Sequence, residues 1–174
     1  MNIHSGKLWT ICLIGALLAA VGCQRTQRAS PLITEYDPND TTAELDFWHG
    51  LADLPLTTNN DAFHGLIIYA NDADPNLTYE DRLAWLIEQG HLDAGFDGQA
   101  DEAVDYGTIA RIMASILDIK GGLTMRLIGP HPRYALRELT FLRIIPTRSV
   151  QQGVPGIEFL GIISRARRYQ ETTS

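Results

Sequence analysis

The acidic loop in the middle of the chain comes closest to a metal-binding pattern. Asp93, Asp97, Gly98 and Asp101 fall at positions 1, 5, 6 and 9 of a twelve-residue calcium loop. Position 3 is a glycine and position 12 is a valine, so an oxygen ligand and the bidentate glutamate are missing. Asp93, Asp97 and Asp101 are thus an incomplete metal site. Solvated loop acids, with Asp105 capping the next helix, are the alternative we favour.

Histidines and nucleophiles show no catalytic spacing. His49 and Asp53 are four residues apart on one predicted helix, and His64 lies two positions before a core leucine. The sequence contains no HExxH, GxSxG, Walker or GxGxxG motif. We expect these histidines to be exposed or half-buried, and we expect no catalytic residue and no cofactor.

A cysteine at the end of an apolar segment indicates a covalent lipid. Lys7 precedes the apolar residues 8–21, which are too few to span a bilayer, since a spanning helix needs about 20 residues. The following "AVGC", ending at Cys23, resembles the lipobox of bacterial lipoproteins. In that family the cysteine receives a diacylglyceryl group, and the peptide bond before it is then cut. The resemblance implies a signal peptide at 1–22 and lipid on Cys23; a plain signal peptide or an uncleaved anchor is the alternative.

The rest of the chain then belongs to the cell envelope. Cys12, the other cysteine, lies inside the apolar segment, so the exported part has no disulfide. Residues 23–40 are polar and interrupted by prolines, which favours a flexible tether between lipid and domain. We expect a membrane-anchored lipoprotein, on the periplasmic or outer face, whose folded domain covers residues 41–174.

Helical patterns dominate that domain. A capping box opens a segment at Thr41 that Pro55 stops, and Thr78 followed by Asp81 opens another that ends near Gly90. Apolar residues at helical spacing indicate four more segments: from about residue 58, around 109–117, from 132 to 145, and from about 155 with fraying over 165–174. The fold prediction is all-α. Residues expected in its core are Ile109, Ile112, Met113, Ile116, Phe159 and Ile163.

The six segments suggest three copies of a helix-loop-helix unit. "VDYGTIARIM" at 104–113 is similar to "VPGIEFLGII" at 154–163, and "NNDAFHGLII" at 59–68 is a looser version. An ordinary six-helix domain whose helices share general features is the alternative. Repeats of this size usually bury their apolar faces against one another. We therefore predict three units packed around one core.

Residues 78–169 resemble surface-layer homology (SLH) repeats. The family's "GYPDG"-like loop is matched by Gly90, Gly95, Phe96, Asp97 and Gly98, and its "VTRAEFA"-like helix start by Val104, Ala110, Val154, Glu158 and Phe159. The resemblance implies helical units and the binding of cell-wall polysaccharide. The family associates this binding with the arginine of "TRAE", where this chain has Tyr106 and Gly156.

Charge is divided unevenly along the chain. Residues 35–105 contain 17 acidic residues and one basic residue, whereas residues 106–174 contain 4 acidic and 10 basic residues. Such asymmetry favours contact with charged matter at one end, although the two halves could instead neutralise each other. Arginine suits carboxylate and phosphate partners because its fork of donors binds them bidentately. The candidate binding residues are Arg126, Arg133, Arg137, Arg143, Arg165, Arg167 and Arg168.

The sequence therefore favours a lipid-anchored, non-enzymatic interaction or scaffold module of the envelope. Its expected partners are the membrane, through Cys23, and an anionic cell-wall glycan or envelope protein, but not nucleic acid. The alternative is an envelope enzyme or enzyme subunit that uses scattered carboxylates such as Asp93, Asp97 and Asp101, assisted by a metal.

Overall fold

The computed structural model describes residues 29–32, 41–120 and 131–173. In these ranges the chain forms helices and no strand, which confirms the all-α prediction. The helices are α2 (Thr41–Asp53), α3 (Asn59–Asn71), α4 (Tyr79–Glu88), α5 (Tyr106–Ile116), α7 (Pro132–Phe141) and α8 (Gly156–Thr173). None of these described helices has the length and apolarity needed to cross a membrane. The predicted lipidation site Cys23 and the candidate Arg126 lie outside the described residues.

Side-chain caps begin three of the helices where the sequence predicts a start. Thr58 caps α3 by accepting a hydrogen bond from the backbone N–H of Asp61. Thr78 and Asp81 form a complete capping box at α4, and Asp105 caps α5. Gly90 follows α4 with φ 71°, a left-handed conformation that glycine adopts without steric cost. Local capping chemistry therefore sets these boundaries.

Two helices end elsewhere than predicted. Helix α7 ends at Phe141 rather than near 145, because the chain turns at Arg143 with φ 59° and buries Ile144 and Ile145 against the core. Helix α8 continues to Thr173, through most of the segment 165–174 in which the sequence predicts fraying.

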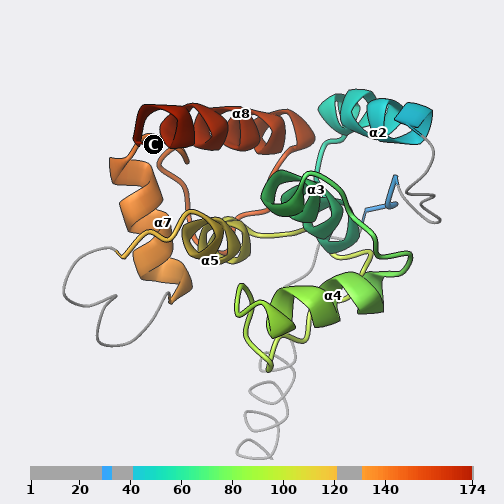
Figure 1. The fold of residues 1–174 in the computed structure, drawn as a ribbon, viewed down its shortest axis with the longest axis horizontal. Helices are drawn as coiled ribbons and strands as arrows, with labels where there is room; N and C mark the ends of the chain where they lie inside the picture. Colours follow the sequence, from blue (N-terminus) through green and yellow to red (C-terminus); the bar gives the residue numbers. More distant parts are fainter. Residues whose placement is uncertain (1–28, 33–40, 121–130, 174) are drawn as a thin grey trace, which may run out of the picture.

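Helix α3 is the central helix of the described part. It lies among α4, α5 and α8 and contacts all three (Figure 1). Residues 59–69 are all buried. Helix α7 packs on α5, and α2 packs on α8. The main helix pairs are thus α3–α4, α5–α7 and α8–α2, which differ from the sequential pairs that the sequence suggests. The three-unit repeat stays a prediction.

Three loops meet in a closed ring of backbone hydrogen bonds. The N–H of Thr57 donates to the carbonyl oxygen of Val154 at 2.8 Å, that of Val154 to Val104 at 3.1 Å, and that of Val104 to Thr57 at 2.9 Å. All three residues are fully buried. Each lies just before a helix, so the ring brings the first turns of α3, α5 and α8 together.

The predicted core is largely confirmed. Ile109, Ile112, Met113 and Phe159 are fully buried. Ile116 and Ile163 are only partly buried at its edge, so the prediction was wrong in placing them inside it. They lie one turn beyond the fully buried Ile112 and Phe159, farther from the loop ring where the helices converge.

Candidate functional site

Helix α7 carries an exposed row of two arginines and a phenylalanine. Arg133, Arg137 and Phe141 are spaced by four residues, so they lie along one face of the helix. All three are exposed, and Phe141 exposes 81% of its surface. The opposite face packs in the core through Ala135, Leu136 and Leu139. The row is therefore not used to hold α7 in place.

The C-terminal part of α8 adds further arginines at the same end of the molecule. The end of α7 lies near the C-terminal end of α8 (Figure 1). Nε of Arg165 donates to the carbonyl oxygen of Ile144 at 2.6 Å, which ties α8 to the segment after α7. Arg165 is half-buried and is engaged in this contact, so we do not count it among the exposed arginines. We define the basic surface by its exposed members: Arg133, Arg137, Arg143, Arg167 and Arg168, with Phe141.

The basic surface lacks acidic partners within the described part of the chain. Its five arginines form no ion pair there, whereas Arg148 pairs with Glu158 at 2.7 Å and Arg111 with Asp93 at 2.9 Å. Among the described residues, Arg111–Asp93 is the ion pair that joins the acidic half to the basic half. The two halves therefore do not neutralise each other through a network of direct pairs in this region.

A second polar cluster joins the first turns of α5 and α8. The hydroxyl of Tyr106 donates to one oxygen of Glu158, and Nη2 of Arg148 donates to the other. The hydrogen bonds from Arg148 and Tyr106 lower the pKa of Glu158. Burial, followed by the contact with Glu158, raises the pKa of Tyr106 to about 12. Tyr106 therefore stays protonated at neutral pH and acts as a hydrogen-bond donor between two helices.

A buried charge cluster that the sequence did not predict links α3 to α4. The carboxylate of Asp74 accepts hydrogen bonds from Nδ1 of His64 at 2.6 Å and from Nε of Arg82 at 2.5 Å. Arg82 also donates to the side chain of Asn60 at 2.9 Å and to the carbonyl of Asn76 at 3.0 Å. The prediction that His64 is exposed or half-buried was wrong. The available signal was Arg82 itself, the single basic residue among the acids of residues 35–105.

This cluster is closed to solvent. The side chains of His64, Asp74 and Arg82 are at most 1% exposed. Burial raises the pKa of Asp74, but hydrogen bonds from His64 and Arg82 and the charge of Arg82 outweigh it and leave the pKa below its usual value. Asp74 is therefore ionised at neutral pH and fixes the loop that leads into α4.

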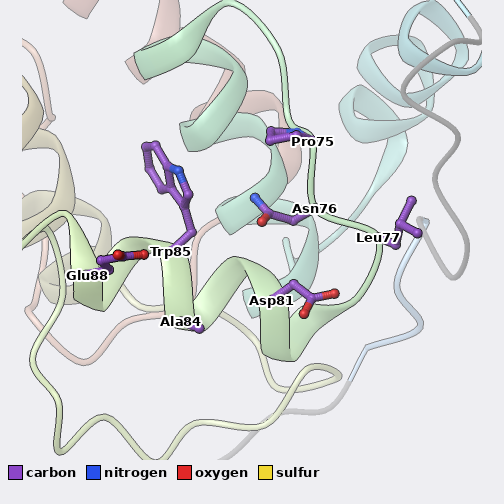
Figure 2. A pocket seen from close by; sticks show the side chains of 7 residues that line it. All are labelled: Pro75, Asn76, Leu77, Asp81, Ala84, Trp85 and Glu88. Atoms are coloured by element: carbon purple, nitrogen blue, oxygen red, sulfur yellow. The ribbon is translucent and has the colours of Figure 1, made fainter.

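A surface depression of about 360 Å³ lies beside this loop, on the exposed side of α4 (Figure 2). It combines apolar and acidic side chains, and its lining residues are Pro75, Asn76, Leu77, Asp81, Ala84, Trp85 and Glu88. Leu77 exposes 56% of its surface, and Trp85 is half-buried. No sequence pattern indicates this depression, because residues of the loop and of α4 form it only when folded together.

The predicted acidic loop is open to solvent. Asp93 and Asp97 are exposed and Asp101 is half-buried, and Asp93 pairs with Arg111. Within the ranges that the structure describes, no three His, Cys, Asp or Glu side chains gather closely enough to hold a metal ion. Asp105 caps α5 through its contact with the N–H of Thr108 at 2.7 Å, as the alternative explanation predicts.

Comparisons of the chain with protein-family models, curated proteins and solved structures gave no match. Its function is therefore inferred from its own surfaces.

Proposed function

We propose that the chain is a lipid-anchored, non-enzymatic interaction module of the cell envelope, whose basic surface binds an anionic glycan or protein. The observation that carries this proposal is a set of five exposed arginines on α7, just after it and on the C-terminal part of α8, with no ion-pair partner among the described residues; the end of α7 lies near the end of α8 (Figure 1). Like charges that repel each other without compensation lower stability, so a surface of this kind is best explained by an external partner.

The chemistry of this surface suits an extended anionic partner. Arginine presents five donors in a planar fork, which matches carboxylate, phosphate and sulfate groups. The four-residue spacing of Arg133 and Arg137 separates them by one turn of α7, about 5–6 Å. Phe141 adds an exposed aromatic face at the end of the same row. The two arginines of such a row can bind successive anionic groups of a polymer or of a protein surface.

The proposed anchor places this surface near envelope components. Lipid on Cys23 and a tether over residues 23–40 would hold the domain at a membrane. For Gly22–Cys23 processing we expect intact-mass analysis of membrane-extracted protein to give an N-terminal cysteine with acyl mass. Cys23→Ser should release the protein from the membrane in a carbonate wash, because its signal segment is too short to span a bilayer. A Cys23→Ser protein that stays membrane-bound would contradict the lipid anchor.

Capture of a partner at two salt concentrations tests the binding function. The full chain is incubated with purified cell wall and with envelope extract, at low and high salt. Binding should be strong at about 0.1 M salt and weak at about 1 M, because the screening length falls from roughly 10 Å to 3 Å. Capture that salt does not weaken, or no capture from either preparation, would contradict an electrostatic binding surface.

A further inference from the structure

The acidic surface beside α4 has the chemistry to receive the basic surface of another molecule. Its depression of about 360 Å³ is lined by Trp85 on α4 and by Pro75 and Leu77 at separate points of the preceding loop (Figure 2). Asp81 and Glu88 lie seven residues apart on α4, so they lie on one face of the helix with Trp85 between them. The site therefore presents the ring of Trp85 between two carboxylates.

The charge of this acidic surface is not compensated locally. Arg82 is the one basic residue of residues 35–105, and it is buried against Asp74. The exposed carboxylates of α4 and its preceding loop form no ion pair with any described residue; they are Asp72, Glu80, Asp81 and Glu88. This surface attracts cationic groups from outside the molecule.

The end of α7 has the complementary arrangement. Phe141 is 81% exposed, with Arg137 one turn before it on the same face and Arg143 two residues after it. The exposed ring of Phe141 can pack against the half-buried ring of Trp85. An exposed aromatic residue between arginines thus faces solvent on one surface, and a depression with Trp85 between carboxylates faces solvent on another.

The two surfaces cannot meet within one molecule. Helices α7 and α4 lie in different regions of the structure, with α5 and α3 between them (Figure 1). Each copy carries both surfaces, so contact between the basic surface of one copy and the acidic surface of the next is head-to-tail.

We propose that the chain associates head-to-tail, with Phe141 of one copy seated in the Trp85 depression of the next and with Arg137 and Arg143 facing Asp81 and Glu88. The inference rests on the proposed function in one respect, because it assigns the anionic partner of the basic surface to a second copy of this chain. A membrane surface favours such contact, since anchoring raises the local concentration of the copies.

The test uses single substitutions that each disable one surface. Phe141→Ser removes the basic surface's aromatic residue and leaves the depression intact, while Glu88→Lys places a cation in the depression and leaves Phe141 intact. The full chain is studied by sedimentation equilibrium in a density-matched detergent. The average mass of the wild type should increase with protein concentration and fall to that of a monomer at about 1 M salt. The dissociation constant of each variant should be at least about tenfold higher than that of the wild type. Ile157→Ser and Asp97→Lys are matched controls, because each replaces an exposed apolar residue with serine or an exposed carboxylate with lysine outside both surfaces.

Mixing the two variants gives the decisive result. The intact Phe141 of the Glu88→Lys protein should dock into the intact depression of the Phe141→Ser protein, so the mixture should form a one-to-one pair and nothing larger. A monomeric wild type, variants that associate as wild type does, or a mixture that stays monomeric would overturn head-to-tail association. Binding of a monomeric wild type to purified anionic glycan, or to vesicles with anionic lipid, would keep the proposed binding function and assign its partner to that source instead.

Discussion

The backbone N–H of Thr57 donates a 2.8 Å hydrogen bond to the carbonyl oxygen of Val154, and this contact joins the segment before α3 to the segment before α8. It closes the ring that also includes Val104. Because all three residues are fully buried, the ring fixes where α3, α5 and α8 start relative to one another. The remaining described helices pack on these three: α4 on α3, α7 on α5 and α2 on α8.

Thr57→Val should stabilise the protein. The hydroxyl of Thr57 is buried and has no hydrogen-bond partner within the described part of the chain, and the other two ring positions are valines. Removing a buried, unsatisfied hydroxyl should raise the free energy of unfolding by about 1 kcal/mol. Chemical denaturation measures the change. The opposite change at another ring position, Val104→Thr, should lower the free energy of unfolding. A Thr57→Val protein less stable than wild type would show that the hydroxyl has a hydrogen-bond partner.

Gly156→Ala should destabilise the domain strongly. A Cβ atom at residue 156 would lie 1.7 Å from the carbonyl oxygen of Leu51, so the α2–α8 contact would have to open. We expect a loss of about 3 kcal/mol or more in the free energy of unfolding, as for other severe packing defects. Gly50→Ala is the control, because its Cβ would meet only the side chain of Leu32 at 3.4 Å. Equal stability of the two variants would mean that α8 does not approach α2 this closely.

Ile112→Asp should unfold the domain or cost several kcal/mol. Ile112 is fully buried on α5, and its replacement would place a carboxylate in the core without a partner. Ile157→Asp makes the same change at a side chain that is 61% exposed, and it should alter stability by no more than about 0.5 kcal/mol. Thermal unfolding followed by circular dichroism compares them. A loss below about 0.5 kcal/mol for Ile112→Asp would place that face of α5 at the surface.

Acid should weaken the fold through Asp74. The pKa of Asp74 in the folded state lies below the ordinary value of an aspartate, so its contribution to stability is complete above that ordinary value and is lost as the pH falls through the folded pKa. Asp74→Asn should cost about 3 kcal/mol or more at pH 7, because it leaves Arg82 buried without its carboxylate, and the difference from wild type should shrink below pH 4. Asp97→Asn, at an exposed position, should follow the wild-type pH profile. A pH-independent difference between Asp74→Asn and wild type would contradict an ionised Asp74.

The sequence predicted features whose signals are local. Thr78 and Asp81 form their capping box, and Ile109 and Ile112 lie in the core, because capping residues and apolar periodicity act over one or two turns of helix. The cluster of Asp74 and Arg82 was missed, since a buried ion pair has no periodic pattern and requires the loop after α3 to fold back on α4. The end of α7 was misplaced because Ile144 and Ile145 continue the apolar content while the backbone turns at Arg143.

The candidate site was predicted in composition but not in shape. Counting arginines identified the basic half, yet their roles differ in the structure: Arg165 binds the carbonyl of Ile144, whereas Arg137 is exposed. The exposure of Phe141 was not predicted either, because an aromatic residue in a helical pattern is ordinarily assigned to the core. Tertiary contacts decide both cases.

The proposed function is tested most directly by comparing Arg137→Gln with Arg148→Gln in binding to purified cell wall and envelope extract. Both substitutions remove one exposed positive charge, but Arg148 is already paired with Glu158. At about 0.1 M salt, where charges interact over roughly 10 Å, Arg137→Gln should weaken capture several-fold and Arg148→Gln should leave it nearly unchanged. Thermal unfolding of both variants checks that each is folded. Equal capture by wild type and both variants would contradict a binding role for the basic surface.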